Sequence, residues 1–388
     1  MKPISLHVSN YRCLANVDLP LRNLNVLIGP NGAGKTSLLE IFQLLQRGSQ
    51  LQLGDFLAEN GGIDAVINRG RNDHRPTKLS IEVTLDVESE RSPEPMTYTV
   101  ELFSLQRTLA IGMERLEWQV TSDAPQPFRY IDANGERIRY YDPVTTKLVT
   151  PNWAYQTNEL ALAQVPKMYQ EPEALRNLLA ITAFHSFLDV SSRSAVRLPQ
   201  PLAPGMRPGP NGDGLYSALF NMRSKAPETY ERILALLEQG FPGFQRLEFD
   251  VVGAGQITLM WLERHSRQPL YPNQLSEGTL RFLWLIATLL SPAIPPLLLL
   301  DEPEVSLHPE LLMLLAGVLQ DVSAGSQIVV ATHSPDLIRW LKPDEVLVVD
   351  KIDGASTFTW ADTMHLEAWL EDFTLRDLWL MGNLGGRP

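Results

Sequence analysis

Residues 24–37 read LNVLIGPNGAGKTS, and this stretch decides the fold class. Residues 24–28 are apolar enough to predict a strand inside a sheet, and residues 37–46, SLLEIFQLLQ, have helical spacing. Between them, residues 29–36 match the phosphate-loop pattern G-x-x-x-x-G-K-[ST] in its required place between a strand and a helix. The alternative is a glycine-rich turn that matches by chance, and the strand–turn–helix context makes it the weaker interpretation.

The residue types of this loop suit a polyphosphate. Gly32 and Gly34 let backbone N–H groups approach phosphate oxygens, and the following helix points the positive end of its dipole at the anion. Lys35 adds a full charge at the β and γ phosphates. The Thr36 hydroxyl is placed to ligate Mg²⁺. The sequence therefore predicts a nucleoside triphosphate site.

A second apolar run, residues 297–300, precedes Asp301 and Glu302 in LLLLDEPE. A strand there would carry both carboxylates to the carboxyl edge of the sheet, where ligands of open α/β sheets bind. Asp301 suits the Mg²⁺ shell, and Glu302 suits a general base that polarises water. The alternative is a strand end with two solvated acids, which a phosphate loop in the same sheet disfavours.

Two further motifs flank this strand. LSEGT opens a helix one element upstream, where Ser276 is a plausible N-cap and nothing more. Its position also lets Ser276 and Gly278 face a second phosphate group. ATHS follows the strand QIVVA, and His333 there could reach a γ-phosphate, although a lone histidine is more often structural.

Composition excludes several classes of protein. The 388 residues carry a net charge of −12 with 44% apolar residues, so disorder and bulk coating of nucleic acid are disfavoured. Cys13 is the one cysteine, which excludes a disulfide framework or a Cys-based zinc site and fits a reducing cytosol. Residues 282–300 lack charge, but three prolines interrupt them, so we expect a buried helix and strand and no membrane span. The start of the chain lacks the apolar core of a secretory signal.

The order of these motifs resembles the head of an ABC-type ATPase of the RecF, SMC and OLD branch. ISLHVSNYRCLANVDLPLRNLNVLIGPNGAGKTSLLE is similar to the opening of that branch, and VSLHP follows the acidic pair as it does there. NGDGLYSALFNMR and LRDLWLMGNLGG are similar to stretches of small stand-alone RecF-like ATPases of AAA type. The resemblance covers residues 1–47 and 270–350 well and the middle loosely.

The resemblance implies an α/β fold: a P-loop NTPase with an ABC-type head, whose mixed, largely parallel sheet is flanked by helices, plus a β-rich and helical insertion. Alternating strands and helices at both chain ends predict that one parallel sheet is built from the two ends. The expected units are an N-terminal head part (1–60), a β-rich subdomain (61–150), a mostly helical insertion (151–270) with a Pro-rich linker or exposed loop (193–212), and a C-terminal head part (271–388).

The resemblance also implies residue roles. Thr36 and Asp301 would hold Mg²⁺, and Lys35, Glu302 and His333 would act in catalysis. Ser276 and Gly278 would contact the γ-phosphate of ATP held by the other protomer, so ATP would be sandwiched in a head-to-tail homodimer that opens on hydrolysis. The triphosphate itself would be bound by Gly29, Pro30, Asn31, Gly32, Ala33, Gly34, Lys35, Thr36 and Ser37.

The function that follows is Mg²⁺-dependent ATP binding and hydrolysis as an ATP-gated dimeric switch, cytoplasmic, in DNA repair or anti-phage defence. One alternative is an ATP-sensing module that controls a separate effector enzyme, and another is the nucleotide-binding subunit of a transporter. The chain departs from the family in reading SEGT where many ABC proteins have SGGQ. It shows neither the heptad arms of SMC proteins nor the nuclease domain of OLD proteins. The glutamine loop has four candidates without a decisive context: Gln43, Gln46, Gln50 and Gln52.

Weaker signals concern partners. Two basic clusters could contact nucleic-acid phosphates, although a solvated surface is the commoner explanation. Tyr11 and Arg12 could pack on the nucleotide, but a plain strand end is the simpler interpretation. Three tryptophans near the C-terminus indicate packing or a partner surface. The clusters are Arg69, Arg71, Arg75 and Lys78, and Arg193, Arg197 and Arg207; the tryptophans are Trp360, Trp369 and Trp379.

Overall fold

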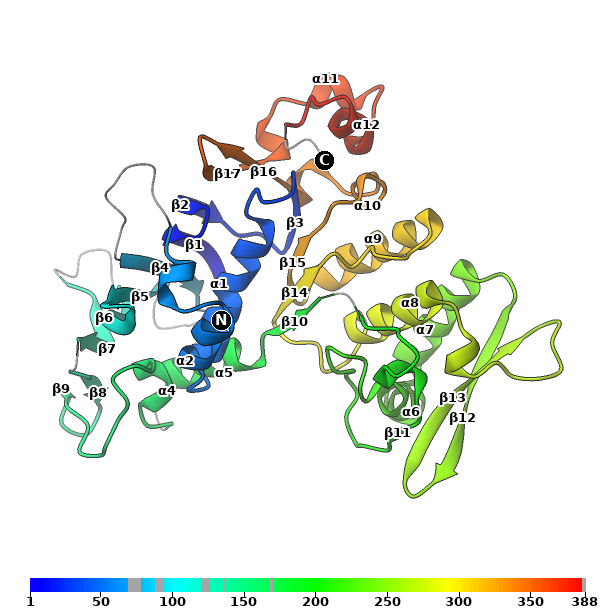
Figure 1. The fold of residues 1–388 in the computed structure, drawn as a ribbon, viewed down its shortest axis with the longest axis horizontal. Helices are drawn as coiled ribbons and strands as arrows, with labels where there is room; N and C mark the ends of the chain where they lie inside the picture. Colours follow the sequence, from blue (N-terminus) through cyan, green and yellow to red (C-terminus); the bar gives the residue numbers. More distant parts are fainter. Residues whose placement is uncertain are drawn as a thin grey trace.

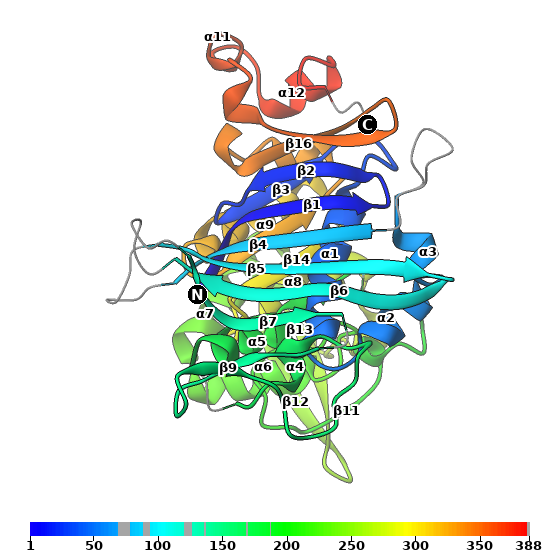
Figure 2. The same cartoon turned by 90° about the vertical axis from the view of Figure 1, so that its left-hand side faces the viewer.

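The computed structural model describes residues 1–68, 78–87, 94–119, 126–135, 137–167, 170–186 and 188–385. Its strands form three sheets, one of eight strands, one of six and one of three. The eight-stranded and six-stranded sheets pack together through the helix that follows the phosphate loop, and the small sheet belongs to a separate lobe (Figures 1 and 2).

The six-stranded sheet is the centre of the molecule. Its first five strands are parallel and its last is antiparallel to its neighbour. The prediction that both chain ends build one sheet is thus confirmed, while the first strand comes from the middle of the chain and was not predicted. In spatial order the strands are β10 (Ala183–His185), β14 (Leu297–Asp301), β15 (Gln327–Ala331), β3 (Leu24–Ile28), β16 (Val346–Ile352) and β17 (Ala355–Trp360).

Helices cover both faces of this sheet, which explains why its strands read as unbroken apolar runs. Alternate residues of β14 enter opposite cores. Leu297 and Leu299 pack in the core that includes α1 (Lys35–Gly48), and Leu298 and Leu300 pack in the core that includes α8 (Glu277–Leu289) and α9 (Pro309–Ser323). The helix of the phosphate loop and the helix of LSEGT therefore lie on opposite faces of the sheet.

The eight-stranded sheet is antiparallel. The N-terminal strand β1 (Lys2–Tyr11) belongs to this sheet and not to the six-stranded one. Its mixed burial, against the fully buried β3, marks a strand with one face toward the core. The remaining strands are β2 (Leu14–Pro20), β4 (Lys78–Asp86), β5 (Met96–Leu105), β6 (Thr108–Trp118), β7 (Phe128–Asn134), β8 (Tyr140–Asp142) and β9 (Lys147–Val149).

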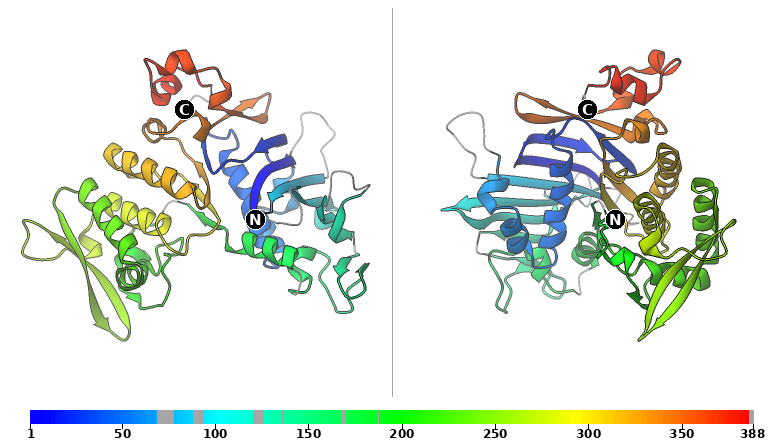
Figure 3. Two further views of the ribbon diagram at one scale, coloured as in Figure 1. Left: turned by 180° about the vertical axis from the view of Figure 1, so that it is seen from behind. Right: turned by 45° about the vertical axis from the view of Figure 1, so that its right-hand side comes forward.

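A lobe formed by residues 198–289 lies to one side of the six-stranded sheet (Figures 1 and 3). The region predicted as mostly helical contains here a β-hairpin that projects from the lobe, with Val251 exposed near its tip. Besides α8, the lobe contains α6 (Leu215–Lys225), α7 (Pro227–Gly240), β11 (Gln200–Pro201), β12 (Phe244–Gly253) and β13 (Gln256–Glu263).

The Pro-rich segment 193–212, predicted as a linker or exposed loop, is exposed at residues 201–205 but is held in place by hydrogen bonds. Arg197 donates through Nη1 to the carbonyl oxygens of Pro272 (2.9 Å) and Leu275 (3.0 Å), just before the LSEGT helix. Trp284 of α8 donates to the carbonyl oxygen of Gly209 (3.0 Å). The segment is therefore held against α8 and the turn before it. Buried backbone carbonyls need hydrogen-bond donors, and Arg197 and Trp284 provide them in opposite directions across this contact.

The remaining helices are short except α5. The tail packs against the sheet through Trp360 and Trp379, which are 5% and 0% exposed, while Trp369 is 48% exposed. In the part of the chain that the structure describes, no helix combines the length and the apolar character that crossing a membrane requires. These helices are α2 (Leu53–Glu59), α3 (Ile63–Val66), α4 (Ala161–Gln164), α5 (Gln170–Ile181), α10 (Pro335–Ile338), α11 (Glu367–Leu370) and α12 (Leu375–Leu380).

Candidate functional site

The phosphate loop turns from β3 into α1 and requires glycine at two positions. Gly29 has φ 149°, and a Cβ there would lie 2.0 Å from the Val349 carbonyl oxygen on β16. Gly34 has φ 117°, and its Cβ would lie 2.5 Å from Ser356 Oγ. A side chain at either position would push the loop away from the strands that support it, because these contacts are shorter than van der Waals separation.

The first turn of α1 is left open for an anion. No side chain caps its N-terminus at Gly34, and the first turn has no acidic residue. Uncapped N–H groups at a helix start carry partial positive charge and bind phosphate oxygens. Lys35 is 4% exposed, and its Nζ donates to the carbonyl oxygens of Gly29 (2.6 Å) and Pro30 (3.1 Å). Burial lowers the pKa of Lys35 to about 8, against the attraction of Glu302, Asp301 and Glu304.

Ser356 braces the loop from behind and was not found by sequence reasoning. Its Oγ donates to the Ala33 carbonyl oxygen (2.5 Å), and its backbone N–H donates to the Cys13 carbonyl oxygen (2.9 Å). The hairpin of β16 and β17 therefore ties the loop to the β1–β2 turn. No sequence signal marks this serine, because the contact joins residues at opposite ends of the chain.

Asp301 lies at the carboxyl end of β14, as predicted, and meets the phosphate loop there. Its carboxylate hydrogen-bonds with the Thr36 side chain and lies within the electrostatic field of Lys35. Burial raises the pKa of Asp301 to about 6, and Glu302 and Glu304 add to the rise, while Lys35 and Thr36 oppose it. The structure thus brings the two predicted Mg²⁺ ligands, one hydroxyl and one carboxylate, into contact.

Glu302 and His333 face one another across neighbouring strand ends. The distance from Glu302 Oε1 to His333 Nε2 is 3.7 Å. Glu302 has φ 51°, a left-handed conformation that costs an L-residue about 1–2 kcal/mol. Its backbone N–H donates to the Ala331 carbonyl oxygen (2.8 Å), which holds it in that conformation. Burial and the charge of Lys35 lower the pKa of His333, so the ring is neutral at pH 7 and can accept a proton.

Glu304 is a third carboxylate of this site that sequence reasoning missed. Its Oε1 accepts hydrogen bonds from Thr332 Oγ1 (2.6 Å) and from the backbone N–H of His333 (2.8 Å). Its Oε2 is buried without a hydrogen-bond partner, and burial raises the pKa of Glu304. Glu304 thereby fixes the turn that carries His333 relative to the strand end that carries Glu302. Glu304 is part of the motif DEPE, but the sequence does not show which of its two glutamates faces the protein interior.

Ser276 and Gly278 lie at the start of α8. Ser276 Oγ accepts from the Thr279 N–H (3.1 Å), so the predicted N-cap is present. A Cβ on Gly278 would lie 2.6 Å from the Ser306 carbonyl oxygen, which explains the glycine by close packing. Since α8 and α1 cover opposite faces of the sheet, the structure does not join LSEGT to its own phosphate loop in one core.

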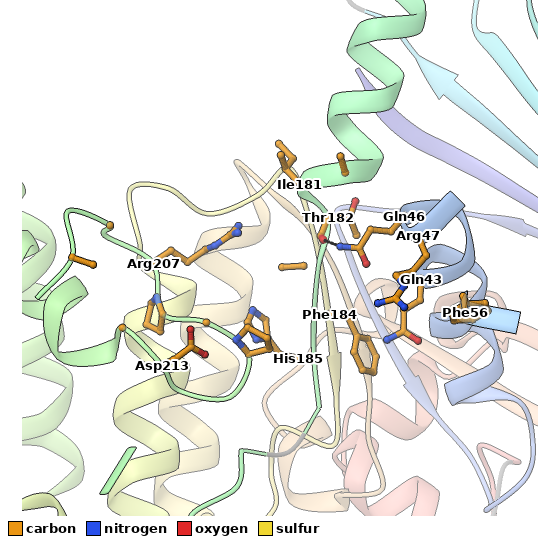
Figure 4. A pocket seen from close by; sticks show the side chains of 18 of the residues that line it. Gln43, Gln46, Arg47, Phe56, Ile181, Thr182, Phe184, His185, Arg207 and Asp213 are labelled. Carbon is orange, nitrogen blue, oxygen red and sulfur yellow. Dashed lines mark hydrogen bonds between the residues drawn. The ribbon is translucent and has the colours of Figure 1, made fainter. Parts of the chain in front are cut away.

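The glutamine-loop candidates lie on or just after α1, away from the strand ends. Gln46 and Gln50 donate to the carbonyl oxygens of Thr182 (2.6 Å) and Ala180 (2.9 Å), so both serve to hold α1 against the segment before β10. Gln43 lines a cavity shown in Figure 4. Gln52 precedes α2. None of these placements supports a role beside Asp301.

Tyr11, Arg12 and several residues of the two predicted basic clusters contact other side chains of the protein. Arg12 Nε lies 2.7 Å from Glu40 Oε2, which also accepts from Tyr11 (3.0 Å), so these residues hold the end of β1 against the side of α1. Lys78 forms an ion pair with Glu101 on the next strand. Arg193 is exposed. Arg69, Arg71 and Arg75 lie outside the described residues.

Metal binding at this site depends on the nucleotide as well as the chain. Within the described ranges, no three or more His, Cys, Asp or Glu side chains group closely enough to hold a metal ion. The contact of Thr36 with Asp301 supplies two oxygen ligands, and Mg²⁺ commonly takes one or two protein oxygens and completes its shell with phosphates and water. The residues therefore fit Mg²⁺ held jointly with a polyphosphate.

Residues 24–339 match the family described as "AAA domain, putative AbiEii toxin, Type IV TA system". The chain belongs to this family. The match runs from β3 to α10, and so includes the phosphate loop, LSEGT, the acidic strand end and His333. Family and fold together identify a P-loop ATPase domain of AAA type.

A curated relative and two solved structures agree with this assignment. An OLD nuclease of Thermus scotoductus is 52% identical over 40 residues, which are 10% of this chain and 8% of that protein. The SmcHead bound to the C-winged helix domain of ScpA is similar with a TM-score of 0.57 and 12% identity, over 92% of this chain and 97% of that one. The Smc head domain with an extended coiled coil, bound to the C-terminal domain of ScpA from Pyrococcus furiosus, is similar with a TM-score of 0.54 and 10% identity. That match covers 96% of this chain and 100% of the other. At these identities the likeness shows the fold alone, a P-loop ATPase head.

We expect the affinity for ATP with Mg²⁺ to be highest between about pH 6 and pH 8. As pH falls through the pKa of Asp301, its carboxylate becomes neutral and Mg²⁺ is held less well; as pH rises through the pKa of Lys35, the ammonium charge is lost. Titration with a fluorescent ATP analogue between about pH 5 and pH 9 measures both limbs. When EDTA removes Mg²⁺, the fall in affinity at low pH should disappear while the fall at high pH stays. A fall at low pH that persists in EDTA contradicts the assignment to Asp301.

We expect Glu304→Ala to lower ATP turnover about tenfold to a hundredfold while the dissociation constant for ATP changes little, because His333 loses its fixed position. Phosphate release and nucleotide titration measure the two quantities. Glu159→Ala is the matched control, because Glu159 is also buried and accepts from the backbone N–H groups of Leu53 (3.0 Å) and Gly54 (3.2 Å), away from the site. Equal loss of turnover in both variants, tracking stability, would contradict the positioning role.

Proposed function

We propose that the chain binds and hydrolyses ATP with Mg²⁺. The observation that carries this proposal is the convergence of Lys35 with Asp301, Glu302 and Glu304 at the carboxyl edge of the six-stranded sheet. The buried ammonium and the uncapped helix start provide positive charge for a polyphosphate, and the carboxylates provide negative charge for its cation. A carboxylate near the terminal phosphate can also activate water. Family membership supports the same proposal.

The roles of the residues follow from their chemistry. The loop amides of residues 29–37 and the Lys35 ammonium hold the triphosphate, and Thr36 with Asp301 holds Mg²⁺, which neutralises phosphate charge when bound. Glu302 orients a water molecule and takes its proton, since its side chain is 48% exposed and lies 3.7 Å from the His333 ring. His333, neutral and 3.7 Å from Glu302, hydrogen-bonds toward the departing phosphate.

We further propose that the active form is a head-to-tail homodimer. Ser276 and Gly278 start a helix on the face of the sheet opposite α1, the helix of their own phosphate loop. In a second copy turned by two-fold symmetry, the same helix start can face that triphosphate. Each site is then completed by the partner, and ATP links the two chains until it is cleaved.

The process in which this switch acts is proposed from likeness and not from site chemistry. The match to an OLD nuclease supports a role on DNA, and the family description, which names a toxin of a toxin–antitoxin system, supports defence over repair. Two alternatives stay open, an ATP sensor that controls a separate effector enzyme and a transporter subunit. Slow turnover with tight ATP binding would favour the sensor, and association with membranes would favour the transporter.

We expect Glu302→Gln to abolish phosphate release while ATP binding is kept, because the amide cannot take a proton from water. Release from wild type and variant is measured with and without linear duplex DNA. Glu310→Gln, on an exposed acid of α9, is the matched control and should behave as wild type. Release that is unchanged in Glu302→Gln contradicts the assigned base, and no release from wild type at any DNA concentration favours the sensor.

We expect Ser276→Asp to be inactive in ATP turnover yet folded, because aspartate also caps helices but places negative charge against the partner's γ-phosphate. Ser276→Asn, a neutral cap, is the matched control. Mixing Ser276→Asp with Lys35→Ala, each inactive alone, should restore about a quarter of wild-type turnover, because half of the dimers are mixed and one of their two sites is intact. A mixture without activity would contradict composite sites.

A further inference from the structure

A cavity of about 660 Å³ lies between α1 and the Pro-rich segment, apart from the phosphate loop. It is lined on one side by the C-terminal half of α1 and by α2, in the middle by residues 180–185, and on the other side by residues 203–217. Figure 4 shows this arrangement, with Gln43 and Phe56 on the α1 side and Arg207 and Asp213 on the far side. A volume of this size suits a ligand as large as a mononucleotide.

His185 is the feature of the cavity that packing does not explain. It ends β10 beside Leu300 of β14 and is 2% exposed, yet both of its ring nitrogens are without a hydrogen-bond partner. One face of the ring meets Trp284 edge-on, with 5.2 Å between the centroids. Burial lowers the pKa of His185 to about 4, so the ring is neutral and offers one donor and one acceptor. A buried polar ring without partners indicates a missing partner in the cavity.

Arg207 supplies a charge to the same cavity. Its side chain is half-buried and extends over the cavity in Figure 4, and within the described residues it forms no ion pair. Burial lowers the pKa of Arg207, and its charge contributes to the lowered pKa of His185. A guanidinium that is partly withdrawn from water and lacks a carboxylate partner favours an anion on the ligand.

The other lining groups narrow the class of ligand. Arg47 and Glu59 lie 2.9 Å apart and neutralise one another, so they add no net charge. Asp213 is exposed and also lines the cavity, where its carboxylate favours a donor group on the ligand. Phe184 lies on the α1 side of β10, facing Gln43 and Phe56. An anion for Arg207, a donor for Asp213 and an apolar ring near the phenylalanines together describe an aromatic organic anion.

We propose that this cavity binds a small organic anion with an aromatic, hydrogen-bonding body, of the size of a nucleoside monophosphate. The anionic group pairs with Arg207, and ring or exocyclic groups of the ligand bond the His185 nitrogens and Asp213. This site is separate from the triphosphate site and does not rest on the proposed hydrolysis. The anion can be a phosphate or a carboxylate, because a guanidinium binds both.

The position of the cavity suggests what occupancy would do. One wall is α1, which starts at the phosphate loop, and the other is the segment that Trp284 and Arg197 fasten to α8 and to the turn before Ser276. A ligand that bridges the two walls would fix the distance between the helix of the phosphate loop and the helix of LSEGT. This consequence rests on the proposed function, whereas binding itself does not.

Isothermal titration of the full chain tests the proposal. A Lys35→Ala background removes the triphosphate site, and the probes are AMP and GMP for the phosphate arm, and an aromatic carboxylate, 4-aminobenzoate, for the other. Inorganic phosphate tests whether the anion alone suffices. We expect one site per chain for at least one aromatic anion, with weaker binding of inorganic phosphate. The absence of binding by every probe at millimolar concentration would overturn the proposal, whatever the ATPase assay shows.

Variants decide whether the binding is in this cavity. Arg207→Ala should weaken binding about tenfold or more, because a charge-assisted hydrogen bond is lost. Arg193→Ala, an exposed arginine of the same segment that does not line the cavity, is the matched control and should bind as the background does. His185→Phe keeps the ring against Trp284 and removes both nitrogens, so it should weaken binding and raise the melting temperature. Binding that is unchanged in both Arg207→Ala and His185→Phe would overturn the proposal.

Discussion

The structure depends on a buried ammonium that lies in the electrostatic field of three strand-end carboxylates. Lys35 is 4% exposed and lies in the electrostatic field of Asp301, Glu302 and Glu304. These acids follow β14, and β15 lies between β14 and β3, the strand that precedes Lys35. Burying one charge costs free energy unless opposite charges and hydrogen bonds compensate. The carbonyl groups of the loop and the strand-end carboxylates supply that compensation, so the loop, β14 and β15 hold one another in place. The glycines of the loop matter because they let this charge come so close to the backbone.

The carboxylates in turn are kept apart by what each one contacts. Asp301 bonds with Thr36, Glu302 faces His333, and Glu304 accepts from Thr332 and the backbone of His333. Three acids within four residues would repel one another in one orientation, and the left-handed conformation of Glu302 turns its neighbours in different directions. The strain at Glu302 is therefore part of how one strand end serves three separate contacts.

Much of the site could be predicted from sequence because its motifs are local. The phosphate loop, the acidic strand end and the helix start at Ser276 each lie within a few residues, and their periodicity places them on strand ends or helix starts. Ser356, Glu304 and His185 could not be predicted, since their roles arise from contacts across the chain or from one turn of backbone. The same limit applies to the fold. β10 is three residues long and shows no period, and the Pro-rich segment is ordered by Arg197 and Trp284, which composition does not reveal.

The topology has a consequence for how the chain is made. β3 carries the phosphate loop near the N-terminus, but its two partners, β15 and β16, come from near the other end. While the ribosome is still synthesising the middle of the chain, this fully buried apolar strand has nothing to pair with. Pairings so distant in sequence form slowly, and unpaired apolar strands aggregate. The nascent chain thus needs protection from aggregation until β15 and β16 have been synthesised. A prematurely terminated chain would lack the strands that hold β3 and the phosphate loop in place.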